Sequence, residues 1–75
     1  MNRRPVQSSN ISGIGWEPSG ENSPTGTLEV AFKSGHVYEY ADVPEQEYLA
    51  FLGASSIGKY FAANIQGKFE HTRLK

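Results

Sequence analysis

The feature that most constrains the fold is an alternation of large apolar residues on both sides of a short turn segment at residues 33–35. The alternating residues are Leu28, Val30 and Phe32 before the turn and Tyr38 and Tyr40 after it. A period of two is typical of β-strands that bury one face. The pattern therefore predicts a β-hairpin over about residues 27–41.

The parity of the turn decides which residues pair across this hairpin. A two-residue loop would turn both tyrosines to solvent, whereas a three-residue loop with Gly35 in the left-handed conformation gathers all the large apolar groups on one face. We therefore predict the second register. Its pairs are Phe32 with His36, Val30 with Tyr38 and Leu28 with Tyr40. The register also places Glu29 opposite Glu39, which is unfavourable by up to about 1 kcal/mol.

A shorter, irregular strand is predicted upstream of the hairpin, at about residues 6–16. Ser12, Ile14 and Trp16 share one side of it, and glycines separate them. Residues 17–26 follow, with prolines, glycines and small polar residues but no periodic apolar face. This composition predicts a mobile loop.

Two helices are predicted in the second half, at about residues 44–52 and 56–66. Pro44 suits the first helical position, and Glu45 and Glu47 complement the positive end of the helix dipole. The apolar positions repeat at helical spacing. They are Tyr48, Phe51 and Leu52 in the first helix and Ile57, Tyr60, Phe61 and Ile65 in the second.

Glycine and serine mark the ends of these helices. We expect Gly53 and Gly67 to end them in the left-handed conformation, and Ser55 or Ser56 to cap the second one. The predicted fold class is therefore α+β, a small antiparallel sheet packed against two helices. With 75 residues and no cysteine, one domain over residues 6–69 is expected, between a flexible N-terminus (1–5) and a C-terminal tail (70–75).

Charge is distributed unevenly along the chain. The net charge is -1, which does not suit a bulk nucleic-acid binder. Arg3 and Arg4 lie near one end and Lys68 and Arg73 near the other, whereas residues 17–47 contain many acids. No targeting or membrane-spanning segment is recognisable, which favours a cytoplasmic location.

The segment GASSIGKY, residues 53–60, resembles the phosphate-binding loop of nucleotide hydrolases. A true loop of this type follows a β-strand and supplies a Ser or Thr to magnesium, but this one follows a predicted helix and has Tyr60 at that position. Two interpretations remain. The segment is either plain helix capping or an anion contact, and the contact would involve Ser55, Ser56, Gly58 and Lys59.

No catalytic, cofactor-binding or metal-binding residue is predicted. His36 and His71 are far apart in sequence and lack carboxylates at metal-site spacing. Residues 8–10, Ser-Ser-Asn, are best explained by capping or turn chemistry. The aromatic residues are expected to serve core packing first, and base stacking is the minority interpretation.

Several short motifs, in this order, closely resemble the KTSC domain, a small module found alone in bacteria and phages and at the C-terminus of some lysyl-tRNA synthetases. The motifs span about residues 6–69. They are Ser8-Ser9-Asn10-Ile11, Leu28-x-Val30-x-Phe32-x-x-Gly35-x-x-Tyr38-x-Tyr40, Val43-Pro44, Ala54-x-Ser56-x-Gly58-Lys59-Tyr60-Phe61 and Ile65. The resemblance implies a compact α+β module without established enzymatic activity. The chain departs from the family pattern at Ala62, Gln66 and Phe69, where the pattern commonly has Asn, a basic residue and Tyr. If those groups carry the family's function, this chain has an altered one.

Three function classes follow. The first is a non-catalytic module that binds RNA or another nucleic acid, with Arg3, Arg4, Lys68 and Arg73 as further contacts beside the Ser-Gly-Lys segment. The second is a protein-interaction or structural module, favoured by the acidic middle of the chain. The third is a helix-turn-helix DNA binder, although its second helix offers only Lys59, Asn64 and Gln66 as polar readers. The partner and the oligomeric state do not follow from the sequence.

Overall fold

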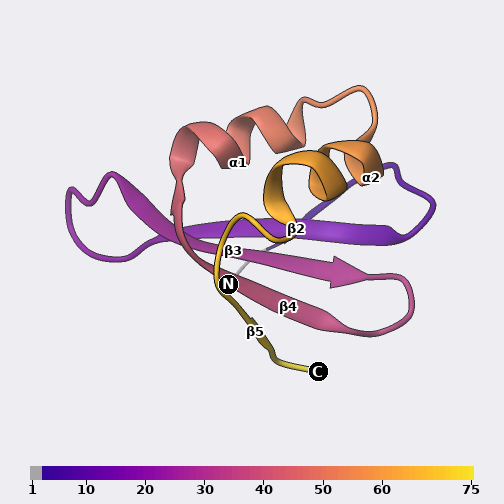
Figure 1. The fold of residues 1–75 in the computed structure, drawn as a ribbon, viewed down its shortest axis with the longest axis horizontal. Coiled ribbons are helices and arrows are strands. Elements are labelled where there is room, and N and C mark those ends of the chain that lie inside the picture. Colours follow the sequence, from indigo (N-terminus) through magenta and orange to yellow (C-terminus); the bar gives the residue numbers. More distant parts are fainter. Residues whose placement is uncertain (1–2) are drawn as a thin grey trace.

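The computed structural model describes residues 3–75 and has an α+β fold, in which the helices cover one face of a five-stranded antiparallel sheet (Figure 1). The strands lie in the sheet in their sequence order. Along the chain the elements are β1 (Arg4–Pro5), β2 (Ile11–Pro18), β3 (Thr25–Phe32), β4 (Val37–Pro44), α1 (Glu45–Leu52), α2 (Ile57–Tyr60), the π-helical turn η1 (Phe61–Ile65) and β5 (His71–Arg73). The predicted fold class is confirmed.

The β3–β4 hairpin has the predicted register. Val30 pairs with Tyr38, and Leu28 pairs with Tyr40. The Phe32 N–H donates to the His36 carbonyl over 2.8 Å, and Gly35 has a φ of +101°, which a residue with a side chain rarely adopts. The choice of a three-residue loop is therefore confirmed.

The predicted pair of like charges is present, but its surroundings differ from the expectation. Glu29 lies opposite Glu39 and is only 8% exposed. Arg3 donates a hydrogen bond from its Nη1 to Glu29 Oε1 and supplies the opposite charge. A Cβ on Gly13 would lie 3.3 Å from the Arg3 Cβ, so the glycine leaves room for this chain segment. Arg3 therefore has a role within the fold.

The first long strand starts later and ends later than predicted. β2 begins at Ile11, and an irregularity in pairing between Ile11 and Gly13 brings both Ile11 and Ile14 into the core. Ser12, predicted to share a side with Ile14, is exposed and donates its hydroxyl to the Ala31 carbonyl. The predicted loop of residues 17–26 is shortened to the segment between Pro18 and Thr25. A bulge breaks the period of two, which is why the sequence pattern misplaced this strand.

Both ends of the chain contribute strands that the sequence did not predict. In the segment predicted as a flexible N-terminus, Arg4–Pro5 pairs with β2, while residues 1 and 2 lie outside the described residues. In the segment predicted as a tail, His71–Arg73 pairs with β4. These strands are short and exposed, so they have no apolar alternation for a sequence pattern to detect.

The helix ends lie close to the predicted ones, but the second predicted helix is divided into α2 and η1 and some caps differ. Pro44 is the N-cap of α1 rather than its first residue. Gly53 has a φ of -90°, so the prediction of a left-handed glycine was wrong there. Its N–H still donates to the Leu49 carbonyl, and the chain continues in a right-handed turn that any residue can adopt. Gly67 has a φ of +77° and Ser56 caps α2, as predicted.

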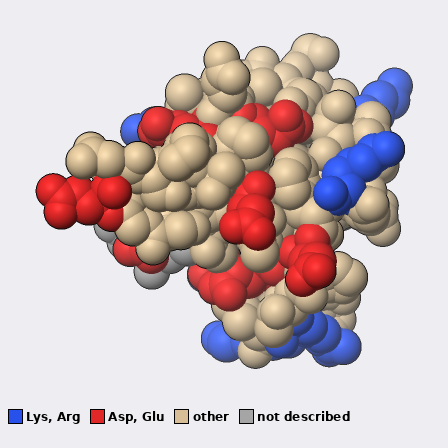
Figure 2. All heavy atoms as spheres, turned by 60° about the vertical axis from the view of Figure 1, so that its left-hand side comes forward, with Lys and Arg blue, Asp and Glu red and all other residues tan. Residues whose placement is uncertain are grey.

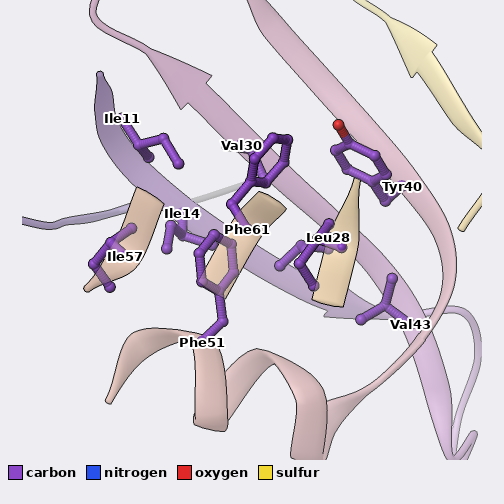
Figure 3. Packing of buried hydrophobic residues seen from close by; sticks show 10 residues of the cluster. Ile11, Ile14, Leu28, Val30, Tyr40, Val43, Phe51, Ile57 and Phe61 are labelled. Atoms are coloured by element: carbon purple, nitrogen blue, oxygen red, sulfur yellow. The ribbon is translucent and has the colours of Figure 1, made fainter. Parts of the chain in front are cut away.

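The core lies between the sheet and the helices (Figure 3). Its buried cluster contains Ile11, Ile14, Leu28, Val30, Tyr40, Val43, Phe51, Ile57, Phe61 and Ile65. Phe51 points from α1 toward the sheet and is fully buried. Packing of the hairpin face against both helical stripes is therefore confirmed. Within residues 3–75, neither helix has the length and hydrophobicity of a membrane span.

Candidate functional site

Two serine-containing segments, far apart in sequence, meet at the surface. Residues 7–10 precede β2, and residues 55–59 run from the α1–α2 connection into α2. Together they line a hollow of about 540 Å³ that we name the serine hollow. A Cβ on Gly58 would lie 3.4 Å from Asn10 Oδ1 and 3.9 Å from Ser8 Oγ. The predicted residues Ser55, Ser56, Gly58 and Lys59 therefore face the Ser-Ser-Asn segment.

Local hydrogen bonds fix both walls of the serine hollow. The Ser8 hydroxyl lies 3.3 Å from the backbone nitrogens of Asn10 and Ile11, which makes a serine turn. The Ser56 hydroxyl accepts from the Lys59 N–H over 3.4 Å. The predicted turn and capping roles are thus confirmed, and the anion contact at residues 55–59 stays a prediction.

Two further hollows adjoin the serine hollow. The N-terminal hollow, about 560 Å³, lies between Arg4 and the α1–α2 connection, and shares Gln7, Ser55 and Ile57 with the serine hollow. The aromatic hollow, about 360 Å³, shares Asn10 and Gly58 with it. Because neighbouring hollows share walls, the three form one continuous surface band.

The surface band differs in charge from the rest of the molecule. Arg4 and Lys59 line it, but none of the eight acidic residues, all of which lie in the described part of the chain, does so. Acidic side chains gather instead on the face shown in Figure 2, with Lys and Arg at its margins. A chain with a net charge of -1 therefore keeps an acid-free surface.

The structure brings together five of the eight predicted contact residues. Arg4 lines the surface band, as do Ser55 and Ser56 before α2 and Gly58 and Lys59 within it. Arg3 pairs instead with Glu29. Arg73 lies on β5, where its Nε donates to the Lys75 carbonyl over 3.1 Å. Lys68 follows η1 and lines none of the three hollows.

The two histidines have structural surroundings. His36 Nδ1 lies 3.2 Å from the Lys75 carbonyl oxygen, and His71 stacks on Tyr38 with ring centroids 5.5 Å apart. Among the residues that the structure describes, no three His, Asp or Glu side chains are grouped to hold a metal ion. Burial, and secondarily the neighbouring Tyr38, raise the pKa of Tyr40. The Tyr40 hydroxyl is therefore protonated at neutral pH.

Tyr60, the last residue of the GASSIGKY segment, ties the two helices together. Its hydroxyl donates to Glu47 Oε1 over 2.6 Å. This hydrogen bond is the main reason that the pKa of Tyr60 rises from 10.0 to about 12, and burial and the Glu47 charge add to it. Tyr60 occupies the position at which a true phosphate-binding loop has its magnesium-binding Ser or Thr. In this chain it instead connects α2 to α1.

The Tyr60→Phe substitution should lower the free energy of unfolding by about 1 kcal/mol at pH 7, because the hydrogen bond to Glu47 is lost. The pKa of Tyr60 is higher in the folded than in the unfolded chain, so its contribution is complete below pH 10 and disappears as the pH rises through about 12. Urea unfolding of both proteins at pH 7, 10 and 11.5 measures the difference. A pH titration of both folded proteins, followed by tyrosinate absorbance, checks the raised pKa of Tyr60. If the parent shows a step near pH 10 that is missing in Tyr60→Phe, the pKa of Tyr60 is not raised.

Sequence reasoning missed part of the surface band. Ser8 and Asn10 were interpreted as turn residues only. Phe32 was assigned to the core, and Tyr38 to the core first, with base stacking as the minority interpretation. All four line hollows. The available signal was the order of the short motifs, in which one Ser-rich segment precedes the first long strand and another lies between the two helices. Only the fold shows that the two segments touch.

Comparison with known proteins identifies relatives over most of the chain. Residues 7–69 match the model of the KTSC domain family. The crystal structure of a KTSC domain protein from Yersinia pestis superposes with a TM-score of 0.85 at 36% identity, covering 99% of this chain and 97% of that one. An uncharacterised protein of Stutzerimonas stutzeri (strain A1501) is 38% identical over 61 residues, which are 81% of this chain and 79% of the relative.

A further relative is much longer than this chain. A lysine–tRNA ligase of Trichormus variabilis (strain ATCC 29413 / PCC 7937) is 44% identical over 52 residues. The aligned part is 69% of this chain but 9% of the ligase. The similarity therefore concerns a small portion of that enzyme.

Proposed function

The chain belongs to the KTSC domain family, and on this premise we propose that it is a non-catalytic module that binds RNA through its phosphate backbone along the surface band. The observation that carries the proposal is the separation of charge. Arg4 and Lys59 line three connected hollows that contain no acid, whereas the chain as a whole is slightly acidic. An anionic ligand is favoured on such a surface and disfavoured on the acidic face shown in Figure 2.

The groups in the serine hollow suit phosphate oxygens. Lysine and arginine supply charge, and serine hydroxyls and amide groups donate hydrogen bonds to phosphate in many nucleic-acid complexes. Ser55 and Ser56 are exposed, as are Ser9 and Asn10 on the facing wall. Four polar side chains and Lys59 thus converge on one hollow from two sides.

One of the relatives supports RNA as the nucleic acid. A lysine–tRNA ligase, an enzyme that joins lysine to tRNA, contains a segment 44% identical to this chain. That segment is a small share of the ligase, as expected for an accessory module rather than for the enzyme's reacting centre. The cytoplasmic location expected from the sequence fits this role.

The hydrogen bonds of Ser8 and Ser56 are not those that catalysis by serine requires. A serine nucleophile needs an adjacent base within hydrogen-bond reach. The Ser8 hydroxyl lies beside Asn10 Oδ1 at 3.0 Å, and Ser56 accepts from a backbone N–H. Neither partner can take a proton from the hydroxyl at neutral pH. This argument supports binding over catalysis.

The Lys59→Ala variant should bind RNA more weakly than the parent and with a smaller dependence on salt. Each phosphate contact releases counterions, so the loss of one lysine contact lowers the slope of log affinity against log salt by about one. Fluorescence anisotropy with a labelled single-stranded RNA and a labelled RNA hairpin, between 20 and 200 mM salt, measures both effects.

Lys68→Ala is the matched control, because it removes the same charge at a residue outside the surface band. It should leave the salt slope close to that of the parent. Equal losses in the two variants would contradict binding along the surface band. If the parent binds neither RNA at 20 mM salt, the RNA proposal fails, and the alternative of a protein-interaction module, for which the acidic face in Figure 2 is a candidate surface, takes its place.

A further inference from the structure

The aromatic hollow is the part of the surface band that phosphate binding does not explain. Its aromatic lining comes from β3, β4 and η1, and its volume of about 360 Å³ falls in the range of small-ligand pockets. Its aromatic side chains are Phe32, Tyr38, Tyr40 and Phe61. Tyr40 and Phe61 are buried beneath it, whereas Phe32 and Tyr38 are only partly buried. Core packing thus explains Tyr40 and Phe61, whereas Phe32 and Tyr38 keep part of their apolar ring surface exposed to solvent.

These rings are held in fixed positions before any ligand arrives. Phe32 meets Tyr38 and Phe61 edge to face, with ring centroids 5.6 and 5.5 Å apart. Tyr38 is backed by His71 in a stacked arrangement. A rigid aromatic surface binds a flat ligand at low cost in conformational entropy. The hollow is therefore suited to an aromatic ring that enters from solvent.

The rim of the aromatic hollow is polar, and the hollow is lined by no Lys, Arg, Asp or Glu side chain. Asn10, Ser34 and Gln66 are all exposed on it. Amide side chains both donate and accept hydrogen bonds, which matches the edges of nucleobases. An aromatic floor with an amide rim is more suitable for a heterocyclic base than for an aliphatic side chain.

The position of the hollow connects the base to the phosphate. Asn10 and Gly58 line both the aromatic hollow and the serine hollow, and Lys59 lies in the latter. Building on the RNA-binding function proposed above, we infer that the aromatic hollow receives one unpaired nucleobase while its phosphate lies in the serine hollow. Bases in a duplex are paired and stacked, so the ligand is single-stranded RNA or an RNA loop.

The test compares two fluorescein-labelled probes of equal length and phosphate number, octaadenylate RNA and an abasic ribose-phosphate strand, by anisotropy at 20 mM salt. The parent should bind octaadenylate at least about fivefold more tightly, because one base that stacks on an aromatic side chain contributes at least that factor. Equal affinity for the two probes would overturn the base pocket and leave phosphate binding intact. Binding of neither probe would remove the RNA proposal and the pocket together.

A pair of alanines supplies matched variants. Ala62 and Ala63 are neighbouring exposed residues in η1, but only Ala62 lines the aromatic hollow. Ala62→Leu should fill the hollow and reduce the ratio of the affinities for octaadenylate and the abasic strand to about one. Ala63→Leu should leave this ratio at the parent's value. A preference that survives Ala62→Leu would overturn the inference.

Amide NMR on the parent provides a second measurement that does not depend on the folding of a variant. Octaadenylate should shift the amides of Ala62 and Gln66, and the abasic strand should not. Shifts confined to residues 55–59 with both probes would place only phosphate on the surface band and would contradict the base pocket.

Discussion

The Phe51→Ala variant should lose about 3 to 5 kcal/mol of unfolding free energy, the usual cost of removing a buried phenyl ring. Phe51 is fully buried and stacks on Tyr60 and Phe61, with ring centroids 5.6 and 6.3 Å apart. Its ring joins α1 to the second helix and to the sheet (Figure 3). A domain of this size has a total stability of the same order. Urea unfolding followed by Trp16 fluorescence and circular dichroism measures the loss.

Leu49→Ala is the control for this prediction, since it changes the same helix two residues away at a side chain that is 55% exposed. It should alter stability by about 0.5 kcal/mol or less. Phe51→Leu keeps part of the apolar volume and should fall between the two, which gives a measurable transition even if Phe51→Ala is largely unfolded. Unfolding midpoints that coincide for the parent and Phe51→Ala would refute the described core.

The central hairpin was predictable because one physical requirement selected its register. Every large apolar side chain had to reach the same face, and only the three-residue loop ending in Gly35 allowed this. The helices were predictable for a similar reason, since their apolar stripes and the Ser56 cap are local signals. In both cases residues close in sequence determine the outcome.

The features that sequence missed depend on contacts between distant residues. Glu29 was predicted only to lie opposite Glu39, but it is buried and paired with Arg3, which lies 26 positions away in the sequence. β1 and β5 form by backbone pairing alone, with side chains that remain exposed. Ile11 enters the core through an irregular pairing that no period of two describes. Tertiary structure decides each of these cases.

In the candidate site, too, local patterns were predictable from the sequence and contacts between distant residues were not. Lys59 and its neighbours were singled out because the Ser-Gly-Lys segment at a helix start is a local pattern. Arg4 was named only for its charge, and the structure places it in an adjoining hollow. Arg73 was named on the same grounds but lies on β5, hydrogen-bonded near the end of the chain. Charge in a sequence therefore indicates candidates, and the fold selects among them.

The Gly26→Ala variant should be strongly destabilised, by about 3 kcal/mol, because a methyl group has no space at this position. A Cβ there would collide with the Glu17 carbonyl of the neighbouring strand and would lie 2.8 Å from Trp16 Cε2. The Glu17 obstruction is backbone, so β2 and β3 must separate locally. Trp16 would then lose its stacking on Tyr48 or its indole hydrogen bond, 2.9 Å long, to the Val43 carbonyl. Urea unfolding and the emission maximum of Trp16, the only tryptophan, report both effects.

Gly20→Ala is the matched control, since Gly20 lies in the β2–β3 loop, has no atom within 4 Å of its would-be Cβ and does not have a positive φ. Alanine at such a position reduces the freedom of the unfolded chain and should leave stability unchanged or raise it by up to about 1 kcal/mol. Trp16 emission should stay that of the parent. The two substitutions add the same methyl group, so any difference between them comes from the close approach of β2 to β3. If Gly26→Ala unfolds at the parent's urea concentration with unchanged Trp16 emission, the close packing of Trp16 against Gly26 is wrong.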